Sequence, residues 1–209
     1  MSNSNLITNY LLQSKAIKLE PAKPFTWASG WKSPVYCDNR ITLSYPEIRK
    51  AICDAFVEKI KHYFPSVEAI VGVATGAIAQ GVLVADKLNL PFAYVRSAPK
   101  SHGMGNLIEG IVEPNQKVVV IEDLVSTGGS SLQAVEALRV AGTEVLGMVA
   151  VFTYEFQVAV DNFKASKCTL ITLTNYNELI DLALKINYIQ PDQVKLLTEW
   201  RQNPDTWQK

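Results

Sequence analysis

Cysteine is scarce in this 209-residue chain, and its three cysteines follow no metal-binding or disulfide pattern. Cys37, Cys53 and Cys168 are odd in number, far apart and without C-x-x-C spacing. We therefore expect neither a disulfide framework nor a zinc site of the usual kinds. Cys53 and Cys168 are interpreted as core residues.

Long hydrophobic runs and an excess of charge of one sign are missing too. No stretch of about 18 apolar residues occurs, and the polar start does not have the basic flank and apolar centre of a signal peptide. We expect a cytoplasmic protein without a membrane segment. Twenty basic residues balance twenty acidic ones, so the chain has no net positive charge to attract polyanions. Nucleic acid is therefore not an expected partner.

Two common nucleotide-binding motifs are absent from the chain. It contains no G-x-x-x-x-G-K-[ST], and no G-x-G-x-x-G follows a predicted strand. The length suits one α/β domain with a small appendage and is too short for two full domains with a linker.

The most informative stretch is residues 118–130, VVVIEDLVSTGGS. Its four β-branched residues predict a strand buried on both faces, which we expect to end at Glu122 and Asp123. A helix should follow from Ser130 to Ala141. Carboxylates accept hydrogen bonds from hydroxyls, and small residues at a helix start form a phosphate cradle, so together they suit a ribose 5-phosphate. Each feature alone fits a buried strand with a solvated acidic turn and a capped helix. Because the strand, the acid pair and the small-residue turn follow one another directly, a ligand site is favoured.

This string resembles the phosphoribosyl pyrophosphate (PRPP) signature of the type I phosphoribosyltransferases. The resemblance implies that Glu122 and Asp123 hold the ribose hydroxyls, and that Asp123 is also catalytic. It assigns the 5′-phosphate to the loop that follows, namely Leu124, Val125, Ser126, Thr127, Gly128, Gly129 and Ser130.

The amino-terminal segment 21–40 is rich in proline, glycine and aromatic residues. On pattern alone it is either an irregular hairpin that packs its aromatics or a wall for a flat ligand. Residues 25–30, FTWASG, and 32–40, KSPVYCDNR, resemble the hood of orotate phosphoribosyltransferases, which contributes to the base pocket. For orotate itself we predict contacts by neutral groups, namely Ser126 first, with Ser29, Gly30 and Tyr36 of the hood beside it. A lysine found in some members is Ala28 here, and an orotate-binding arginine that some members place near Tyr154 is absent.

Residues 74–77, ATGA, lie between a predicted strand, 69–73, and a predicted helix, 78–88. A strand, a turn of small residues and a helix form a second anion cradle by the same physics. In the family this turn faces the pyrophosphate, which implies PRPP contacts by Thr75 and Gly76. Gly76 stands where some members carry a lysine.

The connection from Ser97 to Gly110 is long, polar and contains three glycines. It is either a solvated hairpin without function or a moving lid. The pattern Arg96-x-x-x-Lys100-x-His102-Gly103 resembles the catalytic loop of orotate phosphoribosyltransferases. This implies PRPP contacts by Arg96, Lys100 and His102, catalytic roles for Lys100 and His102, and His102 or a water as proton donor. A second lysine common in the family is Ser97 here.

Together these features predict one α/β domain, 1–209, with a doubly wound, mostly parallel five-stranded sheet and a small amino-terminal hood, 1–43. The expected strands are 69–73, 92–95, 117–122, 144–152 and 167–173. Helices are expected at 5–19, about 46–63, 78–88, 130–141, 176–186 and 191–200, with one more beginning at 153–155.

The resemblance implies transfer of the phosphoribosyl group from PRPP to orotate, giving orotidine 5′-monophosphate and pyrophosphate in pyrimidine synthesis. It also implies Mg²⁺ held mainly by PRPP and water without a protein metal site, and a homodimer with shared active sites. Two alternatives are a phosphoribosyltransferase for another base and a non-catalytic PRPP-sensing regulator of nucleic acid. The absence of a basic patch and of an added helix-turn-helix domain argues against the regulator.

Overall fold

A six-stranded sheet forms the centre of the computed structural model, which describes residues 3–27, 29–98 and 107–207. The strand order is β10 (Leu170–Asn175), β9 (Glu144–Thr153), β8 (Lys117–Val125), β5 (Ala69–Val73), β6 (Phe92–Val95) and β7 (Ile108–Glu109). Neighbouring strands are parallel except β7, which pairs antiparallel with β6. The five predicted strands are therefore confirmed, and the short edge strand β7 makes the sheet six-stranded rather than five-stranded.

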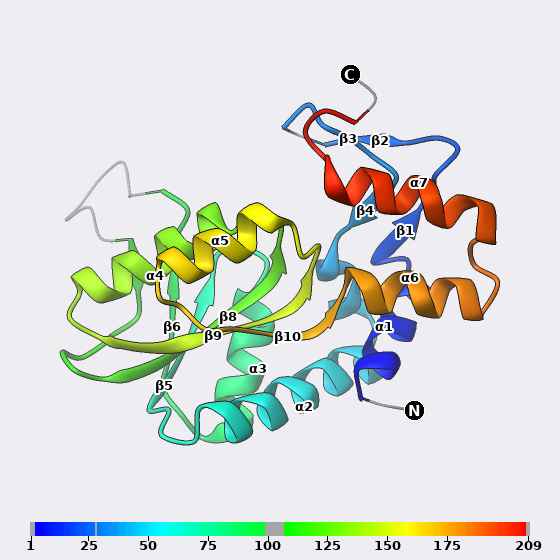
Figure 1. Cartoon of the computed structure of the whole chain (residues 1–209). Coiled ribbons are helices and arrows are strands. Elements are labelled where there is room, and N and C mark those ends of the chain that lie inside the picture. The colour runs from blue at the N-terminus through cyan, green and yellow to red at the C-terminus, as the bar shows by residue number, and fades with distance from the viewer. Residues whose placement is uncertain (1–2, 28, 99–106, 208–209) are drawn as a thin grey trace.

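Helices cover both faces of this sheet (Figure 1). One face carries α2 (Pro46–Tyr63) and α3 (Ile78–Leu88), and the opposite face carries α4 (Gly129–Val140) and α5 (Gln157–Ala165). The side chains of β8 alternate between the two cores: Val119 and Ile121 pack on the α2 side, whereas Val118 and Val120 pack on the α4 side. A strand covered on both faces needs no polar alternation, which explains its continuous apolar sequence.

The hood is built from α1 (Asn3–Gln13), two short antiparallel pairs and the 3₁₀ helix η1 (Asn39–Ser44). The pairs join β1 (Ile17–Leu19) to β4 (Val35–Cys37), and β2 (Phe25–Thr26) to β3 (Lys32–Ser33). The carboxyl-terminal helices α6 (Tyr176–Lys185) and α7 (Pro191–Gln202) lie beside these elements (Figure 1). In α7, Trp200 is fully buried and its Nε1 donates to the Lys32 carbonyl at 3.0 Å, so it is a packing residue, as expected.

Four predicted elements have wrong boundaries. The strand expected at 167–173 runs from Leu170 to Asn175, because Lys167 takes a positive φ of 48° before the strand begins. The first helix ends at Gln13 rather than residue 19, because Lys15 takes a positive φ of 59° and the chain then enters β1. Strand β8 continues past the acids to Val125, since Val125 still pairs with Thr153 of β9. The helix after β9 begins at Gln157, because β9 runs to Thr153 and Glu155 has a positive φ of 54°.

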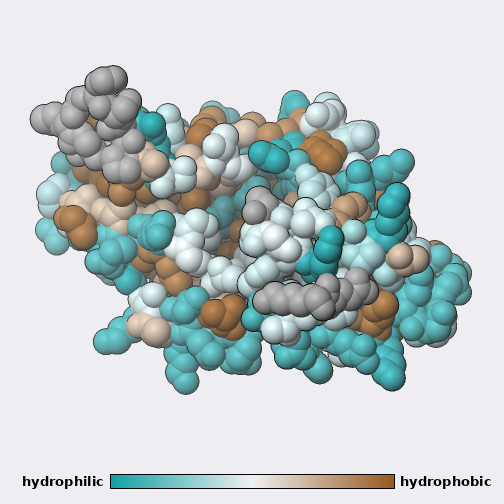
Figure 2. All heavy atoms as spheres, turned by 90° about the horizontal axis from the view of Figure 1, so that it is seen from above, coloured by the Kyte–Doolittle hydropathy of each residue, from teal (hydrophilic) through white to brown (hydrophobic). Residues whose placement is uncertain are grey.

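Figure 2 views the molecule from above, from the side of α4, α5 and α7 in Figure 1. Hydrophobic residues on this face occur in small groups among hydrophilic ones. Within the described ranges, every helix is too short or too polar to cross a bilayer. The assignment of the whole chain to one domain, with residues 1–43 as its hood, stays a prediction.

Candidate active site

The acid pair and the 74–77 turn meet at the carboxyl edge of the sheet because β5 and β8 are adjacent and parallel. Ile121, the residue before the pair, stands opposite Gly72 in the register of the two strands. A cavity of 370 Å³ opens there, which we call the acid cavity. Its lining residues come from β4, η1, β5, the turn, β8 and α4: Cys37, Asp38, Arg40, Val73, Ala74, Thr75, Gly76, Glu122, Asp123, Leu124 and Ser130.

Glu122 points to the α4 side of the sheet and is 5% exposed. Its Oε2 accepts from the Ser131 hydroxyl at 2.7 Å, and its Oε1 accepts from the Asp123 backbone N–H at 2.9 Å. Burial, followed by the negative charge of Asp123, raises the pKa of Glu122 to about 8. Both of its oxygens already have protein donors, so it is the less available of the two carboxylates for a ligand.

Asp123 points to the opposite side, toward the hood and the 74–77 turn. Its backbone carbonyl accepts from the Asn39 side-chain amide at 2.6 Å, which ties η1 to β8. Its carboxylate lies over Gly76: a Cβ built on that glycine would stand 2.7 Å from Oδ1 and closer still to Oδ2. Burial raises the pKa of Asp123, although a hydrogen bond with Glu122 and the positive charge of Arg40 oppose the shift.

The loop from Leu124 to Ser130 passes from β8 into α4. Leu124 and Ser130 line the acid cavity, whereas Val125 is fully buried and offers a ligand only its backbone. Gly128 caps α4 with a φ of 82°, a conformation that favours glycine. The first turn of a helix has N–H groups without intrahelical partners, and these attract anions. The loop thus offers unpaired backbone N–H groups at a helix start, and its role as the phosphate cradle stays a prediction.

A second cavity, of 270 Å³, lies under the hood, and we call it the aromatic cavity. It shares Cys37 and Leu124 with the acid cavity, so the two spaces are neighbours. Its other lining residues combine flat rings with small hydroxyls, namely Thr26, Trp27, Tyr36, Ser126 and Tyr154. Trp27 is held in place because its Nε1 donates to the Val35 carbonyl at 3.1 Å. Burial raises the pKa of the Tyr154 hydroxyl and of the Cys37 thiol, so both are neutral near pH 7.

The structure does not bring every predicted residue to these cavities. Ser29 and Gly30 are exposed in the β2–β3 hairpin and line neither cavity. Arg96 likewise lines neither; its Nη1 lies 3.5 Å from the Glu109 carboxylate. Lys100 and His102 lie outside the described residues. The roles proposed for these five residues stay predictions.

Sequence reasoning missed several residues of the site. Asp38 and Arg40 line the acid cavity, and Trp27, Cys37 and Tyr154 line the aromatic cavity, yet none was assigned a ligand. Asp38 and Arg40 lie at the end of segment 21–40, which was predicted as a possible wall for a flat ligand, and that position was the available signal.

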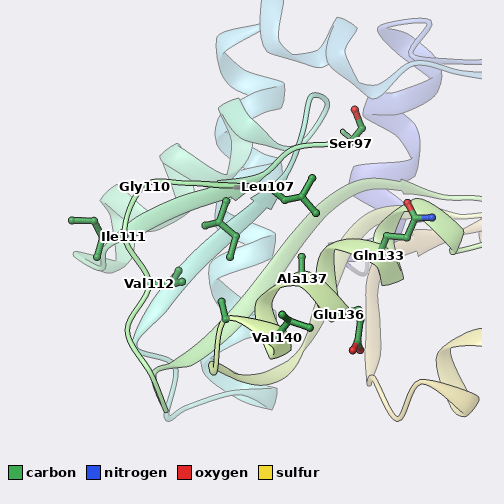
Figure 3. Close-up of a pocket in the computed structure, with 11 residues that line it drawn as sticks. Ser97, Leu107, Gly110, Ile111, Val112, Gln133, Glu136, Ala137 and Val140 are labelled. Carbon is green, nitrogen blue, oxygen red and sulfur yellow. The ribbon is translucent and has the colours of Figure 1, made fainter. Parts of the chain in front are cut away.

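A larger cavity of 890 Å³ lies away from the acid pair (Figure 3). It opens between the segment around β7 and the face of α4 that carries Gln133, Ala137 and Val140. The side chains that line it are mostly apolar, and Glu136 is its single charged residue among those described. A carboxylate without a nearby cation does not suit a phosphate, so we do not place the sugar phosphate there.

The acid cavity and the aromatic cavity together offer acceptors for a diol, donors for a phosphate, and rings for a flat heterocycle. A ligand with ribose, phosphate and a planar base would use all three.

Comparison with known proteins agrees with this geometry. Residues 42–187 match the family described as phosphoribosyl transferase domain. Orotate phosphoribosyltransferase of Porphyromonas gingivalis is 60% identical over 97% of this chain and 96% of its own length. The Lactococcus lactis subsp. cremoris protein of the same name is 53% identical over the whole of both chains. The crystal structure of orotate phosphoribosyltransferase from Aeropyrum pernix, 25% identical, superposes with a TM-score of 0.73 over 88% of this chain and 99% of that one. The chain therefore belongs to the phosphoribosyltransferase family and, within it, to the orotate phosphoribosyltransferases.

Proposed function

We propose that the chain transfers the 5-phosphoribosyl group of PRPP to orotate across the boundary between its two cavities, giving orotidine 5′-monophosphate and pyrophosphate. The observation that carries this proposal is the pair of residues that both cavities share, Cys37 and Leu124. A ribose on the acid pair would present its C1 to a base in the aromatic cavity. The reaction serves pyrimidine synthesis.

In this arrangement Asp123 is the main acceptor for the ribose hydroxyls. The Glu122 oxygens already accept from the Ser131 hydroxyl and from the Asp123 backbone N–H. Glu122 therefore holds the backbone of Asp123 in place, and only its remaining lone pairs can accept from the ribose hydroxyls. The backbone N–H groups and hydroxyls of residues 124–130 hold the 5′-phosphate at the start of α4. Ribose and phosphate are thereby fixed at two points, which orients C1.

The chemical step exchanges one bond at C1 for another. The bond from C1 to the pyrophosphate oxygen breaks, that oxygen keeps the electron pair, and a nitrogen of the orotate ring, ionised or nearly so, forms the new bond to C1. Positive charge develops on the ribose and negative charge on the leaving group, so catalysis requires positioning and anion stabilisation rather than a protein nucleophile. Thr75 and the backbone at Gly76 face the leaving group, and Arg96, Lys100 and His102 are proposed to neutralise it. His102 or a water would supply a proton.

Mg²⁺ fits the acid cavity, because carboxylates and hydroxyls are the hard oxygen ligands that this ion prefers. Glu122, Asp123 and Ser130 provide such oxygens at its wall. Within the described residues no group of three or more His, Cys, Asp or Glu gathers to hold a metal. We therefore propose that PRPP oxygens and water would supply most of the ion's ligands and that these side chains would help to hold it. When bound, the ion neutralises charge on the diphosphate.

Orotate recognition is assigned to neutral groups. The aromatic cavity presents the hydroxyls of Thr26, Ser126 and Tyr154, and no lysine or arginine is among its described lining residues. The rings of Trp27 and Tyr36 can stack on the base. Ser126 lies between the acid pair and the phosphate loop in the chain, so it is the first candidate for the orotate carboxylate, and Ser29 and Gly30 remain candidates beside it.

We also propose a cytoplasmic homodimer in which the loop that carries Lys100 and His102 reaches the partner's site. This part of the proposal rests on the family resemblance.

The test is a spectrophotometric assay of base consumption with PRPP and Mg²⁺, in which orotate is compared with uracil, adenine, guanine, hypoxanthine and xanthine. We expect consumption of orotate alone, with a requirement for PRPP that ribose 5-phosphate does not meet. A higher kcat/KM for uracil or for a purine would contradict the proposal. An Asp123→Asn variant serves as the control, because it should retain the fold and lose PRPP affinity.

A further inference from the structure

The acid cavity has an unusual balance of charge for a site that takes a polyphosphate. Three carboxylates line it, those of Asp38, Glu122 and Asp123, and Arg40 is the single cation among the described residues of its wall. Asp38 is already paired with Arg40, and both Glu122 oxygens already accept hydrogen bonds, so Asp123 is the carboxylate that would repel a bound diphosphate most. A cation next to the diphosphate would offset that repulsion. Arg40 can supply that charge.

The 74–77 turn cannot supply the charge itself. Gly76 has no side chain, and the place of its Cβ is filled by the Asp123 carboxylate, 2.7 Å away at Oδ1. Any longer residue there would displace Asp123. Thr75, the polar side chain of this turn, is neutral. The turn therefore offers backbone N–H groups and one hydroxyl, and among the described lining residues the positive charge lies on the other side of the cavity, at Arg40.

Arg40 is held in one orientation by the hood. Its Nε donates to Asp38 Oδ1 at 2.7 Å and its Nη2 to Asp38 Oδ2 at 2.9 Å, the two-point geometry in which arginine binds carboxylates. The same Oδ1 accepts from the Arg40 backbone N–H at 3.2 Å. Because Asp38 occupies one side of the guanidinium, Nη1 and the outer N–H of Nη2 remain on the other side, where they can donate to phosphate oxygens.

The segment that carries Arg40 is anchored to the acid pair. Asn39, the preceding residue, is 4% exposed and donates its side-chain amide to the Asp123 carbonyl at 2.6 Å. Its own carbonyl accepts from the Thr42 hydroxyl at 2.6 Å. The Arg40 side chain is 59% exposed, so it borders open space rather than protein. Anchored backbone and accessible head group are the features of a ligand contact rather than of a packing residue.

We propose that Arg40 binds the diphosphate of PRPP and holds the pyrophosphate leaving group, with Asp38 as the residue that positions it. This inference rests on the proposed function, since it assigns the diphosphate to the acid cavity. It makes the hood a contributor to the leaving-group side of the site as well as to the base side.

The test compares Arg40→Ala and Arg40→Lys with the unchanged enzyme. Lys50→Ala is the matched control, because Lys50 is an exposed cation of the neighbouring α2 that does not line the cavity. We expect Arg40→Ala to raise the KM for PRPP and the dissociation constant of inorganic pyrophosphate about tenfold, the size of a charge-assisted hydrogen bond. Arg40→Lys should recover part of the loss, and Lys50→Ala should behave as the unchanged enzyme.

Orotidine 5′-monophosphate provides the decisive comparison, because it carries the ribose and the 5′-phosphate but no diphosphate. Its dissociation constant should stay within twofold in Arg40→Ala. An equal loss for this nucleotide and for pyrophosphate would overturn the proposal, since Arg40 would then act through the acid pair. Unchanged affinity for PRPP and pyrophosphate would also overturn it. Calorimetric titration of pyrophosphate measures binding without turnover, so it tests the role of Arg40 independently of the proposed function. The proposed function would fail if the unchanged enzyme did not consume orotate.

Discussion

Replacing Gly76 with alanine should separate the function of the acid pair from the stability of the fold. Gly76 does not have a positive φ, so the backbone accepts alanine without strain. The new Cβ would fall 2.7 Å from Asp123 Oδ1, well inside normal contact, and the short aspartate side chain has to rotate away. Such a rotation costs about 0.5–1.5 kcal/mol, and the lower chain entropy of alanine in the unfolded state offsets about 0.4–1 kcal/mol of it.

The free energy of unfolding should therefore change by less than about 1 kcal/mol, whereas PRPP binding should suffer. Hydrogen bonds to a charged group are worth about 1.5–3 kcal/mol, so a misplaced Asp123 carboxylate should raise the KM for PRPP by about tenfold to a hundredfold. The assay is steady-state kinetics with urea unfolding of the same variant. In an Asp123→Ala background the glycine substitution should have little further effect. Unchanged PRPP kinetics in Gly76→Ala, or full additivity of the two substitutions, would refute this reasoning.

Three further predictions concern the acid pair, the base and the loop. The pKa of Glu122 is raised from 4.5 to about 8 in the folded protein, so between these pH values the folded protein keeps a proton that the unfolded chain has lost. The free energy of unfolding should therefore fall as pH rises from about 4.5 to 8. At about 1.4 kcal/mol per pKa unit, the fall is at most about 5 kcal/mol. Glu122→Gln should flatten that profile in urea unfolding without ligand, and parallel profiles would contradict Glu122 as the group responsible. Ser126→Ala should raise the KM for orotate more than that for PRPP, by roughly two- to tenfold for one neutral hydrogen bond; an effect on PRPP alone would assign Ser126 to the phosphate loop. Mixing Lys100→Ala protein with a Ser126/Asp123 double mutant should restore activity through hybrid dimers with one intact site, and no recovery despite verified subunit exchange would exclude loop sharing.

The strands of the sheet and the helices that cover it were predictable, because each is marked by an apolar pattern within its own short stretch of sequence. Val118 to Ile121 is buried on both faces, as a run of four β-branched residues indicates. The end of that strand was not predictable in the same way. The two acids Glu122 and Asp123 predicted the end of the strand. Leu124 and Val125 continue it, because they pair with Phe152 and Thr153 of β9. Pairing between distant segments, rather than local propensity, decides such boundaries.

The same difference between local sequence and long-range contacts explains which site residues were predictable. Glu122, Asp123 and the loop after them were predicted, because one continuous stretch carries them. Arg40 was not, since it reaches the acid cavity only through the fold of the hood and the contact of Asn39 with Asp123, 84 residues further along the chain. The edge strand β7 is two residues long, too short to produce a periodic pattern.

A crystal structure with orotidine 5′-monophosphate tests the central claim most directly, namely that the acid pair holds the ribose while the aromatic cavity holds the base. The ribose hydroxyls should lie within about 3.2 Å of the Asp123 carboxylate, and the base should lie among Trp27, Tyr36 and Ser126. A base bound in the 890 Å³ cavity beside α4, or a ribose without contact to Asp123, would contradict the account.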